Sequence, residues 1–92
     1  MFKSIDTKLE EIGFMLVQDC DTHIHYERYD DTSGFTHTVL IIHKKSGKHI
    51  IMSYDENLMD KRGIGNTCVG LTYSEIKLFM KKMKKKGWID KR

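Results

Sequence analysis

Four short segments with the composition of β-strands, separated by brief turn sequences, most constrain how this chain can fold. The clearest is THIHYERY at residues 22–29, where Ile24 and Tyr26 alternate with polar side chains, as in a strand with one buried face. The other three segments are residues 14–18 (FMLVQ), 35–42 (FTHTVLII) and 48–54 (KHIIMSY). The turns between them, such as DDTSG and KKSG, are too short for a parallel crossover. We therefore expect an antiparallel four-stranded meander.

An amphipathic helix is expected before these strands. Apolar side chains recur at helical spacing at Phe2, Ile5, Leu9 and Ile12. Gly13 follows at the point where a left-handed residue commonly ends a helix. The chain contains no proline, so neither helices nor strands are interrupted by one.

A second helix is expected at residues 73–86. Thr72 and Glu75 have the spacing of a capping box, and Gly87 marks the end of the helix. Its expected buried stripe consists of Ile76, Phe79, Met80 and Met83. The sequence thus predicts a single α+β domain over residues 1–92: helix, four-stranded antiparallel meander sheet, helix, with both helices on one face.

The composition indicates an intracellular protein. No segment approaches the ~18 consecutive apolar residues of a membrane span. The N-terminal residues are charged from Lys3 onward and lack the apolar core of a signal peptide. Cys20 and Cys68 stand in no paired motif, which favours two free thiols in a reducing compartment. We expect a cytoplasmic protein without a membrane segment.

Positive charge is concentrated at the C-terminal end. Residues 72–92 contain eight lysines and arginines against two acidic residues, a net charge of +6 within a total of +3, so the rest of the chain sums to −3. A localised basic region favours one docking surface over a uniform basic coat.

A helical projection of this region predicts the docking residues. With Ile76 at the centre of the buried stripe, and at about 100° per residue, Lys81, Lys82 and Lys85 fall on the far side with Leu78 among them. An ordinary solvated face explains this pattern equally well. The functional alternative is a surface for an acidic protein or a nucleic acid, formed by Lys77, Leu78, Lys81, Lys82 and Lys85.

The glycines of the long connection between the last strand and the second helix resemble a phosphate-binding loop only loosely. Gly70 is followed by Leu71 and Thr72, whereas a P-loop requires a lysine and a hydroxyl residue there. We expect a turn that orients the helix, and no nucleotide cofactor.

The cysteines and histidines include one possible set of metal ligands. Cys20, His23 and His25 form a C-x-x-H-x-H string, which Cys68 would complete to four ligands. No standard zinc spacing matches this set, so we expect no metal site and interpret the strand histidines as solvent-facing.

The third strand suggests self-association. Val39, Leu40, Ile41 and Ile42 place apolar side chains on both faces of the sheet. The helices can cover one face only, so the open face needs a second copy of the chain or another partner.

Much of the chain resembles small uncharacterised proteins encoded by phages and prophages of low-GC Gram-positive bacteria. The resemblance is carried by IGF, YERY, HKKSGKHIIMSYD and VGLTYSEIKLFMKKMKKKGW. It implies a non-catalytic accessory protein that binds a host or phage macromolecule, with counter-defence as one such role. The binding surface would be the basic helix or the open sheet face.

The segment KLEEIGFMLVQDCDTHIHYERY is similar to the opening of HicA-type toxins. Thr22 and His23 match the family's S/T-H pair, with Asp21 in place of its glycine. This resemblance implies a double-stranded-RNA-binding-like fold and an mRNA interferase that uses His23 or His25 as general acid or base. A nucleic-acid-binding protein without catalysis is the third alternative.

Overall fold

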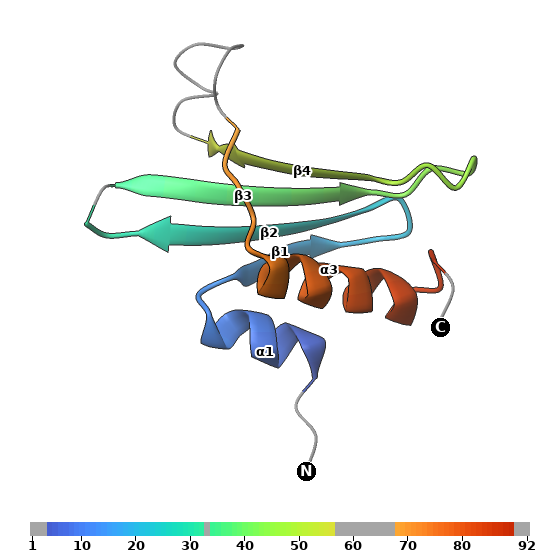
Figure 1. Ribbon diagram of the computed structural model, residues 1–92, viewed down its shortest axis with the longest axis horizontal. Helices are drawn as coiled ribbons and strands as arrows, with labels where there is room; N and C mark the ends of the chain where they lie inside the picture. Colours follow the sequence, from blue (N-terminus) through green and yellow to red (C-terminus); the bar gives the residue numbers. More distant parts are fainter. Residues whose placement is uncertain (1–3, 33, 57–67, 90–92) are drawn as a thin grey trace.

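The fold is a four-stranded antiparallel sheet with one helix before it and one after it (Figure 1). The computed structural model describes residues 4–32, 34–56 and 68–89. The elements are α1 (Ile5–Glu11), β1 (Met15–Asp19), β2 (His23–Asp30), β3 (Phe35–Ile42), β4 (Ile50–Asp55) and α3 (Tyr73–Lys85). The strands lie in the order β1-β2-β3-β4, and each neighbouring pair is antiparallel. The predicted α+β meander with two helices is confirmed.

The register of the strands divides the sheet into two different faces. Ile24 pairs with Ile41 and Tyr26 with Val39, and all four side chains are fully buried. Because successive side chains in a strand alternate, Leu40 lies on the opposite face. We call this second face the open sheet face, because neither α1 nor α3 covers it. The predicted distribution of apolar side chains over both faces of β3 is therefore observed.

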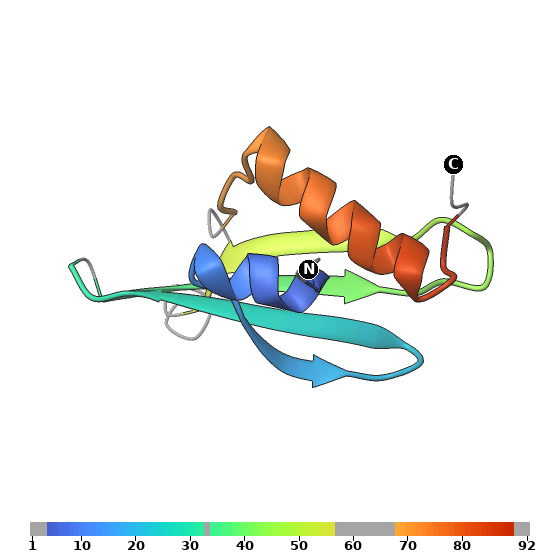
Figure 2. The same ribbon diagram turned by 90° about the horizontal axis from the view of Figure 1, so that it is seen from below.

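Both helices lie on the same face of the sheet (Figure 2). Phe79 of α3 packs between the aromatic rings of Phe14 and Tyr26, with ring centroids 5.3 and 5.4 Å apart. The buried core consists of Leu9, Phe14, Ile24, Tyr26, Val39, Ile41, Phe79 and Met83. These residues come from α1, β2, β3, α3 and the α1–β1 turn, so the core joins distant parts of the sequence.

Local signals place the ends of α1. The Ser4 hydroxyl accepts a hydrogen bond from the Thr7 backbone N–H at 3.1 Å, which caps the helix start. The earlier predicted helix position, Phe2, lies outside the described residues. Gly13 has a φ of 98°, and a Cβ at this position would lie 3.0 Å from the Arg28 side chain. Glycine is therefore required there both for the backbone turn and for space.

The predicted capping box of α3 is confirmed. The Thr72 hydroxyl accepts from the Glu75 N–H at 3.1 Å, and the Glu75 carboxylate accepts from the Thr72 N–H at 2.8 Å. Gly87 has a φ of 78°, and the Trp88 N–H donates to the Met83 carbonyl at 2.9 Å. The helix thus begins and ends where the sequence predicted, within one residue.

The predicted orientation of α3 about its axis is confirmed for Phe79 and Met83, which are buried, but it is wrong for Met80 and Lys82. Its buried residues are Glu75, Phe79, Lys82 and Met83, and Leu78 also packs against the core. Met80, expected in the buried stripe, is 41% exposed. Two charged side chains occupy the sheet-facing side because ion pairs there compensate their burial. Lys82 and Leu78 therefore do not lie on an exposed lysine face.

Among residues 4–32, 34–56 and 68–89, no helix is both long and apolar enough to cross a membrane. Gly63 and Gly65 of the connection before α3, where a turn is expected, lie outside the described residues.

Candidate functional site

The solvent-facing side of α3 combines basic and apolar side chains. Tyr73, Lys77, Lys81 and Lys85 follow one another at four-residue spacing, and all four are exposed. Tyr73 is 75% exposed, and the Lys77 ammonium lies 5.4 Å from the centre of its ring. We call this surface, together with Met80, the outer face of α3. It borders a shallow hollow of about 340 Å³ lined by Tyr73, Ile76, Lys77, Met80, Lys81 and Lys84.

Lysines on the other side of α3 are engaged in ion pairs. The Lys82 ammonium lies 3.0 Å from the Asp6 carboxylate and 3.1 Å from that of Asp19. Burial alone would lower the pKa of Lys82, but hydrogen bonds that its ammonium donates to Asp6 and Asp19 raise the pKa above its ordinary value. Lys86 contacts Asp19 at 2.5 Å and donates to the Cys20 carbonyl at 3.2 Å. These contacts tie the end of α3 to β1 and its turn.

The basic residues of α3 therefore form two groups. Lys82 and Lys86 neutralise carboxylates of the same molecule. Within the described parts of the chain, Lys77, Lys81 and Lys85 have no carboxylate within ion-pairing distance. Of the predicted docking set, the structure thus brings these three lysines together and separates Lys82 from them. Leu78 lies at the edge, where it lines a second shallow hollow with Ser74, Lys77 and Lys81.

The turn between β1 and β2 holds a cluster around His23. Its Nε2 lies 3.0 Å from the side-chain amide oxygen of Gln18, and its Nδ1 lies 3.1 Å from the Thr22 hydroxyl. Because the Gln18 oxygen only accepts, His23 in this arrangement donates from Nε2, which leaves Nδ1 to accept from the Thr22 hydroxyl or the Cys20 thiol. The Cys20 sulfur lies 3.4 Å from Nδ1. Neutral His23 thus has both the donor and the acceptor that general acid–base chemistry requires.

The Cys20 thiol is more acidic than an ordinary cysteine. Hydrogen bonds from the Thr22 hydroxyl, and then from the backbone of Thr22 and His23, lower its pKa below the ordinary 9.0. Burial and the charge of Asp21 oppose this effect without reversing it. The sequence grouped Cys20 with His23 as possible metal ligands, but the contact with the Thr22 hydroxyl depends on the geometry of the turn.

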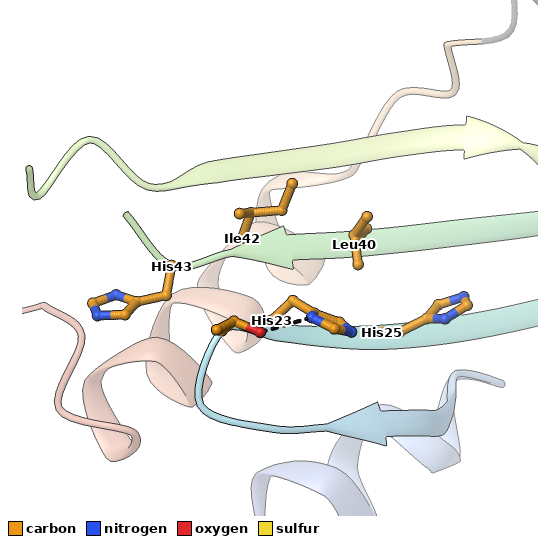
Figure 3. Close-up of a pocket in the computed structure, with 6 residues that line it drawn as sticks. His23, His25, Leu40, Ile42 and His43 are labelled. Carbon is orange, nitrogen blue, oxygen red and sulfur yellow. Dashed lines mark hydrogen bonds between the residues drawn. The ribbon is translucent and has the colours of Figure 1, made fainter. Parts of the chain in front are cut away.

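His23 and His25 both line a hollow of about 450 Å³ on the open sheet face (Figure 3). Its walls are Thr22, His23, His25, Leu40, Ile42 and His43. The two predicted histidines nevertheless have different neighbours. His23 contacts Gln18 and the turn, whereas His25 Nε2 lies 3.1 Å from the Glu27 carboxylate.

The Cys20, His23, His25, Cys68 set does not assemble. Cys20 follows β1 at one edge of the sheet, whereas Cys68 forms a β-bridge with Tyr54 in β4 at the other edge. Within the described residues, the only group of three or more potential ligands is His25, Glu27 and Glu56.

A buried polar network was missed by sequence reasoning. Arg28 pairs with Glu75 at 2.8 Å and donates to His37 Nδ1 at 3.1 Å. His37 Nε2 donates to the Ser53 hydroxyl at 2.6 Å, and only 1% of His37 is exposed. Burial, and then the charge of Arg28, lower the pKa of His37, although Glu75 opposes them. The expectation that all strand histidines face solvent is therefore wrong for His37.

Two further histidines attach the β3–β4 turn to the chain end after α3. The His43 and His49 Nδ1 atoms lie 3.2 Å apart, and His49 Nε2 donates to the Trp88 carbonyl at 2.7 Å. The His43 ring stacks on the Trp88 ring with centroids 4.8 Å apart. These contacts give His43 and His49 a structural role at the end of the sheet.

Comparisons with protein-family models, curated proteins and solved structures found no match to this chain. The candidate sites are therefore defined by geometry alone. They are the outer face of α3, the His23 cluster and the open sheet face.

Proposed function

We propose that this protein is a non-catalytic binding module that docks on an acidic protein surface through the outer face of α3. The observation that supports this proposal is the division of the α3 lysines into two groups. Lys77, Lys81 and Lys85 are free of ion pairs with the described residues, and this row of lysines lies beside exposed Tyr73 and Met80. Such a surface offers charge for steering a partner and apolar area for affinity.

A protein partner fits this surface better than a nucleic acid. The neighbouring helix α1 presents Glu10 to solvent beside α3, and the chain outside residues 72–92 has a net charge of −3. An extended phosphate backbone along the helix layer would meet these negative charges. Exposed tyrosine and methionine side chains are typical of protein-binding surfaces.

The resemblance to phage and prophage proteins supports a biological setting for this activity. We propose that the protein acts in the cytoplasm of an infected or lysogenic bacterium, on a host or phage protein. An accessory role of this kind, including counter-defence, requires binding and no reaction.

Charge reversal tests the proposal. Lys81→Glu/Lys85→Glu changes the outer face of α3, and Lys44→Glu/Lys45→Glu makes the same charge change on the exposed β3–β4 turn. Each protein is used for affinity purification from the bacterial host, and the affinity of the recovered partner is then measured with purified components. We expect the α3 variant to bind about tenfold more weakly or worse, and the turn variant to bind as the wild type does.

Other results would count against the proposal. If the α3 variant retains full affinity, the outer face of α3 is only a solvated surface. If wild type recovers DNA or RNA through the same lysines, the nucleic-acid-binding alternative replaces the protein partner.

A second candidate function is ribonuclease activity. It is favoured by His23, which offers a donor and an acceptor nitrogen beside the hollow on the open sheet face. Single-stranded RNA would be incubated with wild type and with a His23→Ala/His25→Ala variant. Cleavage by the wild type alone would establish this alternative, and negligible cleavage by both would remove it.

A further inference from the structure

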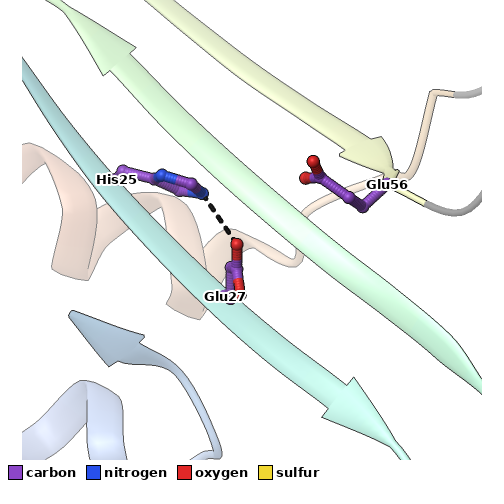
Figure 4. Close-up of side chains that lie close together, drawn as sticks. All are labelled: His25, Glu27 and Glu56. Carbon is purple, nitrogen blue, oxygen red and sulfur yellow. Dashed lines mark ion pairs between the residues drawn. The ribbon is translucent and has the colours of Figure 1, made fainter. Parts of the chain in front are cut away.

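Three potential metal ligands converge on the open sheet face. His25 and Glu27 are two residues apart in β2, so both side chains leave the same face of the sheet. Glu27 pairs across the sheet with Thr38, and Thr38 pairs with Tyr54, two residues before Glu56. One ligand atom from each of His25, Glu27 and Glu56 lies within 4.8 Å of the other two (Figure 4). The sheet register therefore brings an imidazole and two carboxylates together from two non-adjacent strands.

The imidazole nitrogen in this cluster lacks a hydrogen bond. His25 Nε2 is shielded from solvent and has no hydrogen-bond partner, although 23% of the side chain is exposed. The Glu27 oxygen lies 3.1 Å away, close enough for an ion pair but outside hydrogen-bonding geometry. A polar nitrogen that is shielded from solvent and has no hydrogen bond lowers the stability of the fold, unless another group binds it.

The carboxylates also lack a full counter-charge. Within the described residues, neither Glu27 nor Glu56 forms an ion pair with a lysine or arginine. The Thr38 hydroxyl donates to Glu56 at 2.5 Å and so fixes the direction of that carboxylate. Two carboxylates at this separation repel each other, and a cation between them would remove the repulsion. Hydrogen bonding from a neighbouring hydroxyl is the usual support for a ligating carboxylate.

We propose that His25, Glu27 and Glu56 bind a divalent transition-metal ion of the Zn²⁺ class. Mg²⁺ and Ca²⁺ prefer oxygen ligands, so the imidazole argues against both ions. A mixed set of nitrogen and carboxylate ligands suits Zn²⁺ and its first-row neighbours. Ligands about 2.0–2.2 Å from Zn²⁺ lie about 3.4 Å from one another in a tetrahedral site. The ligand atoms of His25 and Glu27, 3.1 Å apart, are already close to this separation. A shift of the Glu56 carboxylate toward them, from within 4.8 Å, would complete the set.

The site would have an open coordination position. Three protein ligands leave the fourth position of a tetrahedral ion for water or another molecule. His25 also lines the hollow of about 450 Å³, so the ion would lie beside that hollow. The ion would join β2 to the end of β4 across β3.

Zn²⁺ binding to the metal-free full chain tests the proposal by calorimetry. We expect one Zn²⁺ per chain, and Glu27→Gln and Glu56→Gln should each lower the affinity by at least about tenfold. Glu10→Gln removes the same charge from the exposed face of α1 and should leave the affinity unchanged. Cys20→Ser/Cys68→Ser should also bind as the wild type does, because no thiol belongs to the site.

Spectroscopy distinguishes loss of a ligand from loss of the fold. Circular dichroism should show folded Glu27→Gln and Glu56→Gln proteins, and the His25 ring signals in NMR should shift with Zn²⁺ in wild type. Co²⁺ should give weak visible bands without thiolate charge transfer. Zn²⁺ binding that survives both glutamate substitutions, binding lost in the cysteine variant, or no binding tighter than millimolar would overturn the proposal.

Discussion

Arg28, whose side chain is 30% exposed, connects the buried polar residues Glu75 and His37 at the border of the core. It contacts Glu75 on one side, His37 on the other, and the ring of Phe14 at 4.1 Å. Buried charges require such partners, because an unpaired buried charge would be strongly unfavourable. The sequence contained a signal for this network. Arg28 is in phase with Ile24 and Tyr26, and His37 is in phase with Val39, so both had to face the helices.

His37 makes stability depend on pH. Its folded-state pKa is lowered from 6.5, so the unfolded chain binds a proton more readily than the folded chain. The contribution of His37 is therefore fully present above about pH 6.5 and decreases as the pH falls below that value. We expect the urea midpoint to decrease between pH 7.5 and 5, and to decrease less in His37→Gln, which keeps an acceptor for Arg28. An identical pH profile in both proteins would contradict the assignment.

Cys20 should react as an activated thiol. Because hydrogen bonds lower its pKa, the pH midpoint of its alkylation by iodoacetamide should lie below 9.0. Thr22→Val removes the largest contribution and should move the midpoint upward. Mass spectrometry of the Cys20 peptide measures both midpoints in the folded protein. A midpoint unaffected by Thr22→Val would mean that the hydroxyl does not stabilise the thiolate.

At the scale of the elements, local signals predicted the helix ends but could not predict the orientation of α3. The capping box and Gly87 involve residues a few positions apart, which a sequence displays directly. Lys82 lies on the core side because its ammonium forms ion pairs with Asp6 and Asp19, which come from distant segments of the chain. A helical projection that treats every lysine as exposed cannot include such long-range pairs. The same limit applies to His25, Glu27 and Glu56, which only the sheet register brings together.

The orientation of α3 predicts unequal roles for its lysines in stability. Lys82→Ala leaves Asp6 and Asp19 without their shared cation and should lower the free energy of unfolding by about 1–3 kcal/mol. Lys85→Ala, one turn away on the outer face, should change it by less than about 0.5 kcal/mol. Urea unfolding at neutral pH measures both. Equal effects of the two substitutions would contradict the burial of Lys82.

At the scale of the whole molecule, the open sheet face is a surface that neither α1 nor α3 covers. Apolar side chains on it include half-buried Leu40 and Ile42, together with Ile50 and Met52, which are 42% and 39% exposed. Exposed apolar patches of this kind commonly mark contacts between chains. A homodimer through this face would leave the outer face of α3 available to another partner.

We expect sedimentation velocity at micromolar concentration to detect this homodimer. Met52→Lys places a charge on the open sheet face and should yield monomer. Met80→Lys makes the same change on α3 and should leave the dimer intact. Only monomer in the wild type would exclude self-association through the sheet.

The central claim is that the partner docks on the outer face of α3 and not on the open sheet face. Mapping the residues that contact the partner tests this claim most directly. Purified partner would be added to ¹⁵N-labelled protein, and the shifted backbone signals would be assigned. We predict that the largest shifts fall on Tyr73, Lys77, Lys81 and Lys85. Shifts confined to Leu40, Met52 and their neighbours on the open sheet face, with α3 unaffected, would contradict docking through the outer face of α3.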